Sequence, residues 1–333
     1  MNQVINFQNI TVVVQGPVQS LSHRDQDEGI THRCLQSVRE YLPGAHIILS
    51  TWKNQNLSGL DFDELVECDD PGSNIREYNQ DGTPHIYNNN RQIVSTLEGL
   101  KRVKTPYAVK LRSDNFLTSN AFVDMQKKYQ KRCSEYQFFQ ERVVVPNIFT
   151  RKYAKGHRVA FHVSDFFYFG RTEDLLTLWD LTFETDFHPT EQQKYNPGYP
   201  DYVIDCTQMF FLRALQKCDP SIQLDSLLDI KNNKVKQSEI CLANNLVIAS
   251  HEEVGLGLCS KFLGKARVSR AKGRCAHYQY LEWQQLYKKY CDHSYPLEYP
   301  YSKRLQLWLE RCRYVYPTYL ETKLKLLIRA IKK

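Results

Sequence analysis

One segment, residues 86–117, constrains the fold of this chain more than any other. Apolar residues recur at helical spacing from Ile93 to Leu100, which predicts a helix with an Asn of the run 88–90 as its N-cap. After a turn, residues 107–111 have the apolar pattern of a buried strand. A helix that leads directly into a buried strand is typical of sheets whose parallel strands are connected by helices.

The residues before this segment continue the same alternation. Strands are predicted at 10–14, 45–50 and 65–68, and a helix at 31–42. Residues 10–115 are therefore predicted to form a doubly wound, mainly parallel sheet of the nucleotide-binding type, an α/β fold.

The second half of the chain contains further predicted elements around a long loop. Helices are predicted at 121–136, 172–179 and 201–215, and strands at 142–146, 159–170 and 247–250. We expect Thr172 to cap the second of these helices. Residues 183–202 carry three prolines and are predicted to form a long loop with a short helix near Pro189. Loops of this length in compact domains tend to be functional or disordered.

Polar residues follow the predicted strands at their carboxyl ends, where ligands bind in open α/β sheets. Arg112, Ser113 and Asp114 come directly after the strand at 107–111. A carboxylate beside an arginine suits a divalent cation that holds a diphosphate, because hard cations take oxygen ligands and share them with substrate phosphates.

Two other strand ends leave a functional and a structural interpretation open. Residues 15–17, Gln-Gly-Pro, can form a phosphate-binding loop or a simple tight turn. The hydroxyls and the aromatic ring at 50–52 can hold a ribose or a base, or they can close the edge of the core. Asp69 and Asp70 resemble metal ligands, but the sequence Asp-Asp-Pro-Gly is first of all typical of a tight turn.

Positive charge is concentrated in the last part of the chain. Residues 261–333 contain 17 Lys and Arg against 5 Asp and Glu, whereas the whole chain has a net charge of only +7. Helices are predicted at 281–290, 305–314 and 320–333, and the last one carries aliphatic residues on one face, flanked by Lys and Arg. Such a basic amphipathic helix can lie in a membrane interface, or it can pack on the body with its basic face in solvent. The charge bias of the whole section favours an anionic membrane surface as partner.

Cysteine usage and hydropathy favour a cytoplasmic protein. The ten Cys residues include no C-x-x-C pair, the first residues lack the pattern of a signal peptide, and no apolar run is long enough to cross a bilayer. We therefore expect reduced thiols, no zinc site, and a location on a membrane surface rather than across it.

Four segments together are similar to a known family. They are VVVQGPV at the first strand, LSTWKNQ at the second, NNNRQIVSTLEGLKRVKTPYAVKLRSDN, and SDFFYFG. In this order and spacing, over residues 10–255, the chain resembles the WavE family of bacterial lipopolysaccharide-synthesis glycosyltransferases, which have a GT-A-type nucleotide-diphosphosugar transferase fold. The resemblance implies transfer of a sugar from a nucleotide-sugar donor to a lipopolysaccharide, capsule or lipid-linked saccharide acceptor at the inner membrane.

The resemblance also implies an organisation of the chain. Residues 1–260 would form the catalytic domain, with a donor half at 10–117 and an acceptor half at 118–260. Residues 261–333 lie beyond the resemblance, and their charge and helical pattern predict a basic helical section that contacts the membrane surface. The donor-binding residues implied are Gln15, Gly16 and Thr51 around the base and ribose, Asn90 and Arg91 facing the donor, and Arg112.

The motif that holds a divalent cation in GT-A enzymes is altered in this chain. A D-x-D-type motif places Mn²⁺ or Mg²⁺ against the diphosphate in that fold. Arg112-Ser113-Asp114 occupies its position here, with Arg112 where the first Asp would be. Asp114 alone remains as a metal ligand, and Arg112 can itself neutralise phosphate charge.

Inverting glycosyl transfer also needs a carboxylate that takes the proton of the acceptor hydroxyl. The candidates are Asp165, Glu191 and Asp205. Asp165 is preferred because an acidic group in an apolar strand is costly unless it is paired or used. Glu191, in the long loop, comes next. His251 is either a further metal ligand or phosphate contact, or a structural residue.

Two other functions remain open from the sequence. A sugar-phosphate nucleotidyltransferase would use a similar sheet, but that class usually has a Gly-rich loop with Lys or Arg after the first strand, and residues 15–18 are poor in both. A non-enzymatic membrane- or nucleic-acid-binding module would use residues 261–333. We expect no nucleic-acid partner, because the sequence contains no recognised nucleic-acid motif.

Overall fold

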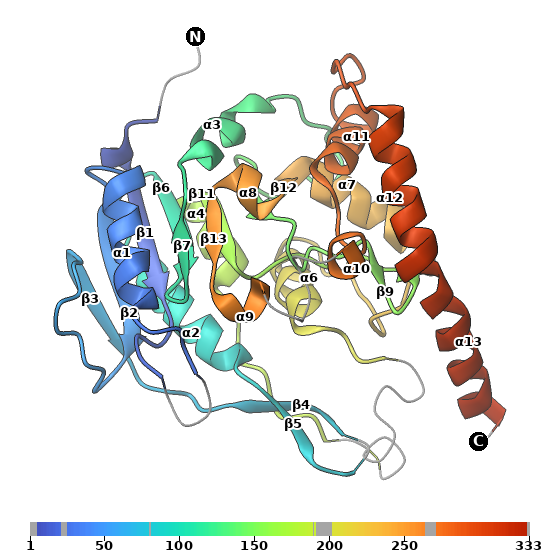
Figure 1. Ribbon diagram of the computed structural model, residues 1–333, viewed down its shortest axis with the longest axis horizontal. Helices are drawn as coiled ribbons and strands as arrows, with labels where there is room; N and C mark the ends of the chain where they lie inside the picture. Colours follow the sequence, from blue (N-terminus) through green and yellow to red (C-terminus); the bar gives the residue numbers. More distant parts are fainter. Residues whose placement is uncertain are drawn as a thin grey trace.

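The computed structural model describes residues 5–20, 25–79, 81–188, 190, 202–263 and 271–331, and it has a central sheet at its core (Figure 1). The strands of this sheet are β1 (Ile10–Gln15), β2 (His46–Trp52), β3 (Glu64–Cys68), β6 (Tyr107–Arg112), β8 (Val143–Pro146), β11 (Phe167–Arg171) and β12 (Leu246–Ala249). Their spatial order is β12-β8-β11-β6-β1-β2-β3. β1 is parallel to both β2 and β6, β2 to β3, and β12 to β8, whereas β11 runs antiparallel to both of its neighbours. The mainly parallel sheet predicted from the sequence is confirmed.

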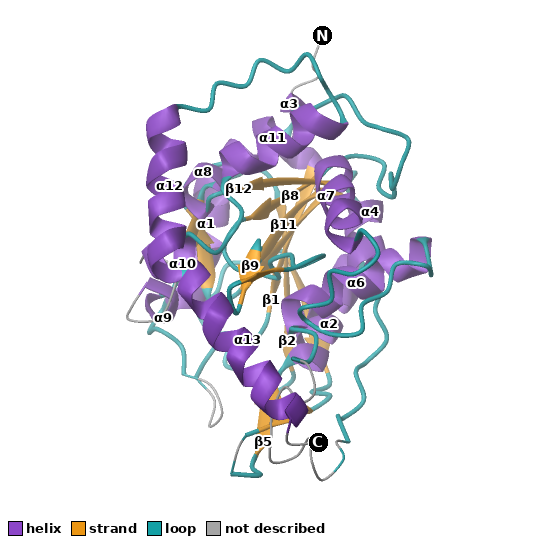
Figure 2. Cartoon of the chain, turned by 90° about the vertical axis from the view of Figure 1, so that its right-hand side faces the viewer, coloured by secondary structure: helices purple, strands orange, loops and turns teal. Residues whose placement is uncertain are grey.

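Helices cover both faces of this sheet (Figure 2), which is why every residue of β1 is buried. They are α1 (Ile30–Tyr41), α2 (Asn89–Leu100), α3 (Ala121–Lys128), α4 (Thr172–Trp179), α6 (Cys206–Cys218) and α7 (Lys234–Asn245). On one face, α2 packs against β1 and β2, and Trp179 of α4 lies edge-on to Tyr168 of β11. On the other face, Phe122 of α3 packs against the rings of Phe167 and Phe169.

Smaller strand pairs surround the sheet. β4 (Asn74–Tyr78) and β5 (Pro84–Tyr87) form a hairpin, and β9 (Tyr153–Ala154) pairs with β10 (His157–Arg158). β7 (Asn115–Leu117) pairs with β13 (Leu256–Leu258), which follows the short helix α8 (His251–Val254). Because of this pairing, the next helix, α9 (Ser260–Leu263), comes to lie near the end of β6. The hairpin was not predicted, since its half-exposed strands lack an apolar alternation.

The C-terminal section begins with residues that belong to the main core. α10 (Ala271–Arg274) is followed by α11 (Tyr280–Tyr290), whose Trp283 and Tyr287 are buried in the same cluster as the sheet. Residues on both sides of the predicted boundary at 260 and 261 therefore share one hydrophobic core. α12 (Tyr301–Tyr314) and α13 (Tyr316–Ile331) follow one another along one side of the molecule (Figure 1). None of the described helices combines the length and the apolar character needed to span a bilayer.

A buried ion triad connects α12 to α11 and to the body. Both carboxylate oxygens of Glu282 accept hydrogen bonds from Arg311, at 2.7 and 2.8 Å, and Lys152 donates to Oε1 at 2.7 Å. Burial alone would raise the pKa of Glu282, but the hydrogen bonds from Arg311 and the charge of Lys152 hold it at about 2.

Two of the predicted elements are shorter than expected because side chains bind the backbone. α3 ends at Lys128 rather than at 136, since the buried Arg142 guanidinium donates at 2.7 Å to the carbonyls of both Tyr129 and Lys131. No strand forms at 159–166. There, Phe161 has a φ of 55°, and its N–H donates to the hydroxyl of Ser238 instead of to a neighbouring strand.

The remaining differences lie at helix starts and in the long loop. α6 begins at Cys206, later than predicted, because the Asp205 carboxylate caps it by accepting from the N–H of Thr207. The N-cap position of α4 is taken by Arg171 rather than by Thr172. Residues 182–188 contain neither helix nor strand, and the short helix expected near Pro189 lies outside the described residues. Helix α7 was not predicted.

Candidate functional site

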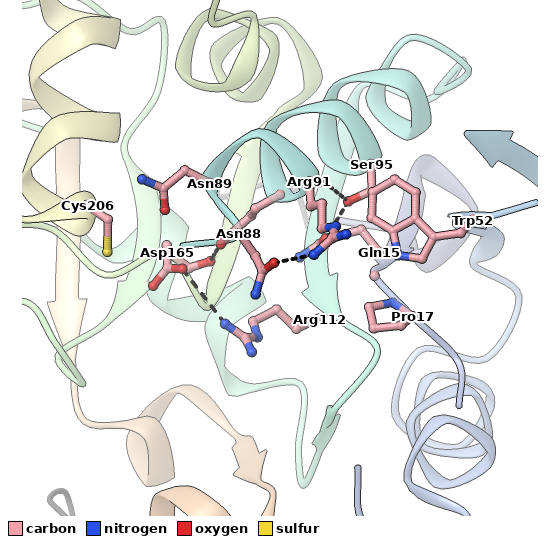
Figure 3. A pocket seen from close by; sticks show the side chains of 12 residues that line it. Gln15, Pro17, Trp52, Asn88, Asn89, Arg91, Ser95, Arg112, Asp165 and Cys206 are labelled. Carbon is pink, nitrogen blue, oxygen red and sulfur yellow. Dashed lines mark hydrogen bonds and ion pairs between the residues drawn. The ribbon is translucent and has the colours of Figure 1, made fainter. Parts of the chain in front are cut away.

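A cavity of about 290 Å³ opens at the carboxyl ends of β1, β2 and β6 (Figure 3). It is lined by Gln15, Gly16, Pro17, Trp52, Asn88, Asn89, Arg91, Gln92, Ser95, Arg112, Asp165 and Cys206. This is the edge of a parallel sheet at which ligands bind in open α/β folds. Its volume is at the lower end of the range for small-molecule sites.

The register of the parallel strands brings their polar ends together. Gln15 lies beside Ser50 of β2 on one side and beside Arg112 of β6 on the other, so β1 and β6 end at one level and β2 continues for two more residues, to Trp52. Gly16 then turns the chain with a φ of 115°, and a Cβ there would lie only 3.1 Å from Ser113 Oγ. Glycine fits both requirements, because other residues rarely adopt this conformation.

Helix α2 supplies the opposite wall of the cavity. Its Arg91 side chain is held by Asp70 through Nε and NH2, at 2.7 and 2.8 Å, and by Asn88 Oδ1, which accepts from NH1 at 2.7 Å. Ser95 Oγ donates to Gln15 Oε1 at 2.8 Å, which ties the helix to the end of β1. Asn88 occupies the N-cap position, but its side chain makes no capping bond.

The partly buried Arg112 and the buried Asp114 form a pair at the end of β6. Nε and NH2 of Arg112 donate to the two oxygens of Asp114, each at 2.9 Å. Lys261 of α9 donates to Asp114 Oδ2 at 2.6 Å. Burial opposes the positive charge of Arg112, but Asp114 holds its pKa above the ordinary value. Asp114 is therefore neutralised from two sides by cationic groups.

Asp165 points into the cavity from the segment before β11. Its Oδ2 lies 3.8 Å from NH1 of Arg112, and Figure 3 shows the two side chains turned toward one another. The backbone carbonyl of Asp165 accepts hydrogen bonds from Gln92 Nε2, at 2.9 Å, and from the buried ammonium of Lys110. These bonds fix the position of Asp165 from behind while its carboxylate faces the cavity.

A family described as WavE lipopolysaccharide synthesis matches residues 10–313, from β1 through almost all of α12. The chain belongs to the WavE family. Membership assigns it to lipopolysaccharide synthesis, and the matched range confirms and extends the resemblance found over residues 10–255.

Other comparisons add nothing to the WavE assignment. No curated protein matches the chain. Among solved structures, it is similar to the crystal structure of HddC from Yersinia pseudotuberculosis, with 10% sequence identity and a TM-score of 0.29 over 63% of this chain and 99% of that chain. At this level the likeness carries no argument.

The structure of this WavE chain brings together most of the site residues predicted from the sequence. Gln15, Gly16, Arg91, Arg112 and Asp165 all line the one cavity.

Thr51 and Asn90 do not line it. Thr51 is fully buried on the opposite face of β2, and Trp52, the next residue, takes its place in the cavity wall because side chains alternate along a strand. The Asn90 side chain donates to and accepts from the backbone of Glu184, at 2.9 and 2.7 Å, and so faces the loop after α4.

The other acidic candidates are not part of the described cavity. Glu191 lies outside the described residues. Asp205 caps α6 and pairs with Arg151 at 3.2 Å and with His162 at 3.6 Å. Burial opposes its ionisation, but His162 and Arg151 hold the pKa of Asp205 well below its ordinary value. His251 begins α8 beside Glu252 and does not reach the cavity.

The residues around Asp114 do not fit the divalent cation expected there. Both of its oxygens are bound to Arg112, and one of them also to Lys261, so two positive groups stand where a cation would bind. Within the described ranges, no group of three or more His, Cys, Asp or Glu residues could hold a metal ion. Asp114 is a partner of arginine and lysine in this structure rather than an available metal ligand.

Sequence reasoning missed several residues of the site. Asn88, Gln92 and Ser95 share one face of α2 with Arg91, and their spacing along a helix was a signal that could have been used. Lys261 carried no such signal, because it lies 147 residues from Asp114 in the chain.

Proposed function

We propose that this WavE protein is a glycosyltransferase of the GT-A type. It would move a sugar from a nucleotide-sugar donor to a lipopolysaccharide, capsule or lipid-linked saccharide. One observation carries the proposal: a partly buried arginine, Arg112, and a carboxylate, Asp165, face each other in a cavity at the carboxyl ends of parallel strands. Arg112 would neutralise the charge of a departing diphosphate, and Asp165 would accept the proton of an acceptor hydroxyl.

The wall formed by β1 and β2 suits the nucleoside part of the donor. Trp52 offers an aromatic surface to a base, and Gln15 and Gly16 offer polar and backbone groups to a ribose. The diphosphate would then lie toward Arg112 and Arg91. Positively charged groups placed where negative charge develops stabilise the transition state of transfer.

Asp165 is the proposed general base of an inverting transfer. Its carboxylate takes the proton of the acceptor hydroxyl while that oxygen bonds to the anomeric carbon. The bond from the anomeric carbon to the diphosphate breaks in the same step, and the charge left on the nucleoside diphosphate is met by Arg112. Lys110 and Gln92 hold Asp165 through its carbonyl, which leaves the carboxylate available for this exchange.

The surface of the C-terminal helices supports a location at the cytoplasmic face of the inner membrane. Large apolar residues are exposed along α12 and α13: Tyr301, Leu305, Trp308, Leu309, Leu320, Leu324, Leu327, Ile328 and Ile331. Exposed Lys and Arg side chains lie among them, at Lys303, Arg304, Arg313 and Lys323. Basic amphipathic helices of this kind bind anionic lipid surfaces, where a lipid-linked acceptor is found.

The donor site is tested by thermal unfolding with UDP, GDP, CMP and their sugars. A ligand at about 100 times its Kd adds about 2.7 kcal/mol to the free energy of unfolding. We expect one nucleotide series to raise Tm. If none does, the assignment of this cavity to a donor is wrong.

The catalytic role is tested with Asp165→Asn and the stabilising donor. We expect transfer to lipid-linked saccharide to fall about 10²- to 10⁴-fold, because the base is lost, while the donor still raises Tm. Asp180→Asn, at an exposed carboxylate paired with Lys217, is the matched control and should keep full activity. An Asp165→Asn enzyme with an unchanged rate would refute the assignment of this base.

A further inference from the structure

One edge of the Arg112 guanidinium makes no hydrogen bond to the described residues. Its Nε and NH2 are both engaged by Asp114, whereas NH1 is turned toward the cavity. The nearest acidic oxygen to NH1, on Asp165, lies 3.8 Å away, beyond hydrogen-bond distance. Among the described residues, none accepts a hydrogen bond from NH1. Arg112 therefore presents N–H donors to whatever occupies the cavity.

Aromatic rings shield this guanidinium from water. Its central carbon lies 4.6 Å from the ring centroid of Phe166 and 5.6 Å from that of Phe262. A charge-assisted hydrogen bond made in such surroundings is stronger than one made in water, because the local dielectric constant is lower. The planar group is also held in place by its paired bonds to Asp114, so little side-chain entropy is lost when it binds an anion.

Two positive side chains surround Asp114. Its carboxylate faces Arg112 and Lys261, and the carboxylate of Asp165 lies 3.8 Å from NH1 of the Arg112 guanidinium. The N-terminus of α2, at Asn88 and Asn89, lines the same cavity and adds the partial positive charge of a helix end. A divalent cation at Asp114 would have to displace both positive groups or lie against them.

We propose that the donor diphosphate is bound without a divalent cation, with the NH1 edge of Arg112 in the place that a metal ion would otherwise take. This inference rests on the proposed function, since it assumes that the cavity receives a nucleoside diphosphate. It assigns Asp114 and Lys261 to positioning: Asp114 orients the guanidinium of Arg112, and Lys261 offsets the negative charge of Asp114.

Calorimetry of UDP and GDP binding to the full chain tests the proposal directly. We expect the diphosphate that binds to have a Kd in excess EDTA within about threefold of its Kd in Mn²⁺ or Mg²⁺. Binding that requires the cation would overturn the inference and leave the proposed function standing. If neither diphosphate binds under either condition, the inference fails, and the thermal unfolding series with CMP and its sugars then decides separately whether the cavity is a donor site.

Variants of Arg112 and Asp114 identify the group that binds the diphosphate. In EDTA, Arg112→Met should weaken diphosphate binding about 10- to 100-fold, the value of a charge-assisted hydrogen bond, and should abolish the preference for diphosphate over monophosphate. Unchanged affinity and preference would overturn the role of Arg112. The matched control is Arg39→Met, which breaks a similar arginine pairing with Asp61 and Asp63 away from the cavity and should leave binding unchanged.

Asp114→Asn separates the two roles that this carboxylate could have. If Asp114 positions Arg112, the variant should bind diphosphate more weakly, and equally so with and without Mn²⁺. If Asp114 is instead a metal ligand, Mn²⁺ should raise the affinity of the wild type for diphosphate, and the Asp114→Asn variant should lose that increase. If either variant fails to fold, the wild-type comparison between EDTA and cation decides by itself.

Discussion

Lys110 is a charged residue that the fold buries completely, on the face of β6 that packs against α4. Its ammonium donates to the carbonyl of Asp165 and lies 4.5 Å from the ring centroid of Trp179. Burial lowers the pKa of Lys110 to about 7. The residue thus supports the proposed base, and its own charge is costly to the folded state.

The pH dependence of stability should reveal this cost. The folded chain holds the Lys110 proton only below about pH 7, whereas the unfolded chain holds it up to about pH 10.5. Because the unfolded state binds more protons between these values, the contribution of Lys110 to the free energy of unfolding rises across that window, by at most about 1.4 kcal/mol per pH unit. Denaturant unfolding at pH 7, 8 and 9 should show that wild type gains stability relative to Lys110→Met as the pH rises. Parallel curves for the two proteins would contradict the assignment.

Helix α2 decides the shape of the cavity at the scale of the element. It carries Asn88, Arg91, Gln92 and Ser95 on the cavity face, and it lies close to the sheet at Gly99. A Cβ at position 99 would stand 2.4 Å from Val13 Cγ1 and 3.1 Å from Ser50 Cβ. The absence of a side chain at this one position sets the distance between the helix and β1.

We therefore expect Gly99→Ala to destabilise the protein even though alanine is the better helix former. Overpacking of this kind costs about 1 to 3 kcal/mol, and moving α2 should also weaken nucleotide binding. Thermal unfolding and nucleotide titration measure both effects. Glu98→Ala, on the same helix and paired with nearby Lys101, serves as the control and should change neither stability nor nucleotide binding by much. A Gly99→Ala protein as stable as the control would show that α2 can shift freely.

At the scale of the whole molecule, the C-terminal section has two parts with different surroundings. α11 is part of the main core through Trp283, and the Glu282 triad attaches the end of α12 to it. Farther along, α12 and α13 expose a row of apolar side chains, with Leu320 at 70% and Ile331 at 75% exposure. Rows of this kind on a soluble surface mark an interaction site, and the surrounding positive charge favours an anionic lipid surface.

Sedimentation with vesicles tests this surface. The wild type should bind vesicles rich in phosphatidylglycerol and bind phosphatidylcholine vesicles more weakly. Its affinity should fall in 0.5 M salt, because salt screens the attraction between the basic side chains and the anionic lipids, already beyond ~8 Å at about a third of that ionic strength. The triple variant Leu320→Gln, Leu324→Gln and Leu327→Gln should lose at least about tenfold in affinity, because less apolar surface enters the interface.

A matched triple variant controls for the loss of exposed apolar residues elsewhere. Leu65, Ile86 and Ile230 are also exposed but lie outside the C-terminal section, so their replacement by Gln should leave vesicle binding intact. If analytical ultracentrifugation shows that wild type self-associates and the Leu320 triple variant does not, the face belongs to a second copy of the chain and the membrane proposal fails.

The sequence by itself determined the secondary elements of the sheet. Periodicity is a local property, so strands at β1, β2, β3 and β6 and the helices between them could be predicted from their own residues. The parallel arrangement then follows from the alternation, and it places the ends of β1 and β6 side by side. The family resemblance implied Gln15, Gly16 and Arg91 as donor-binding residues, and Arg112 and Asp165 were selected from their own sequence surroundings.

Only the tertiary structure decided what these residues bind to. Thr51 turns away from the cavity because side chains alternate between the two faces of a strand, and Asn90 turns away because each step along a helix rotates the side chain by about 100°. The end of α3 is set by Arg142, a side chain beyond the helix itself. Asp114, which looks like a metal ligand in the sequence, is instead paired with Arg112 and Lys261. An ion pair depends on which segments the fold brings together, and α9 reaches Asp114 only because β13 pairs with β7.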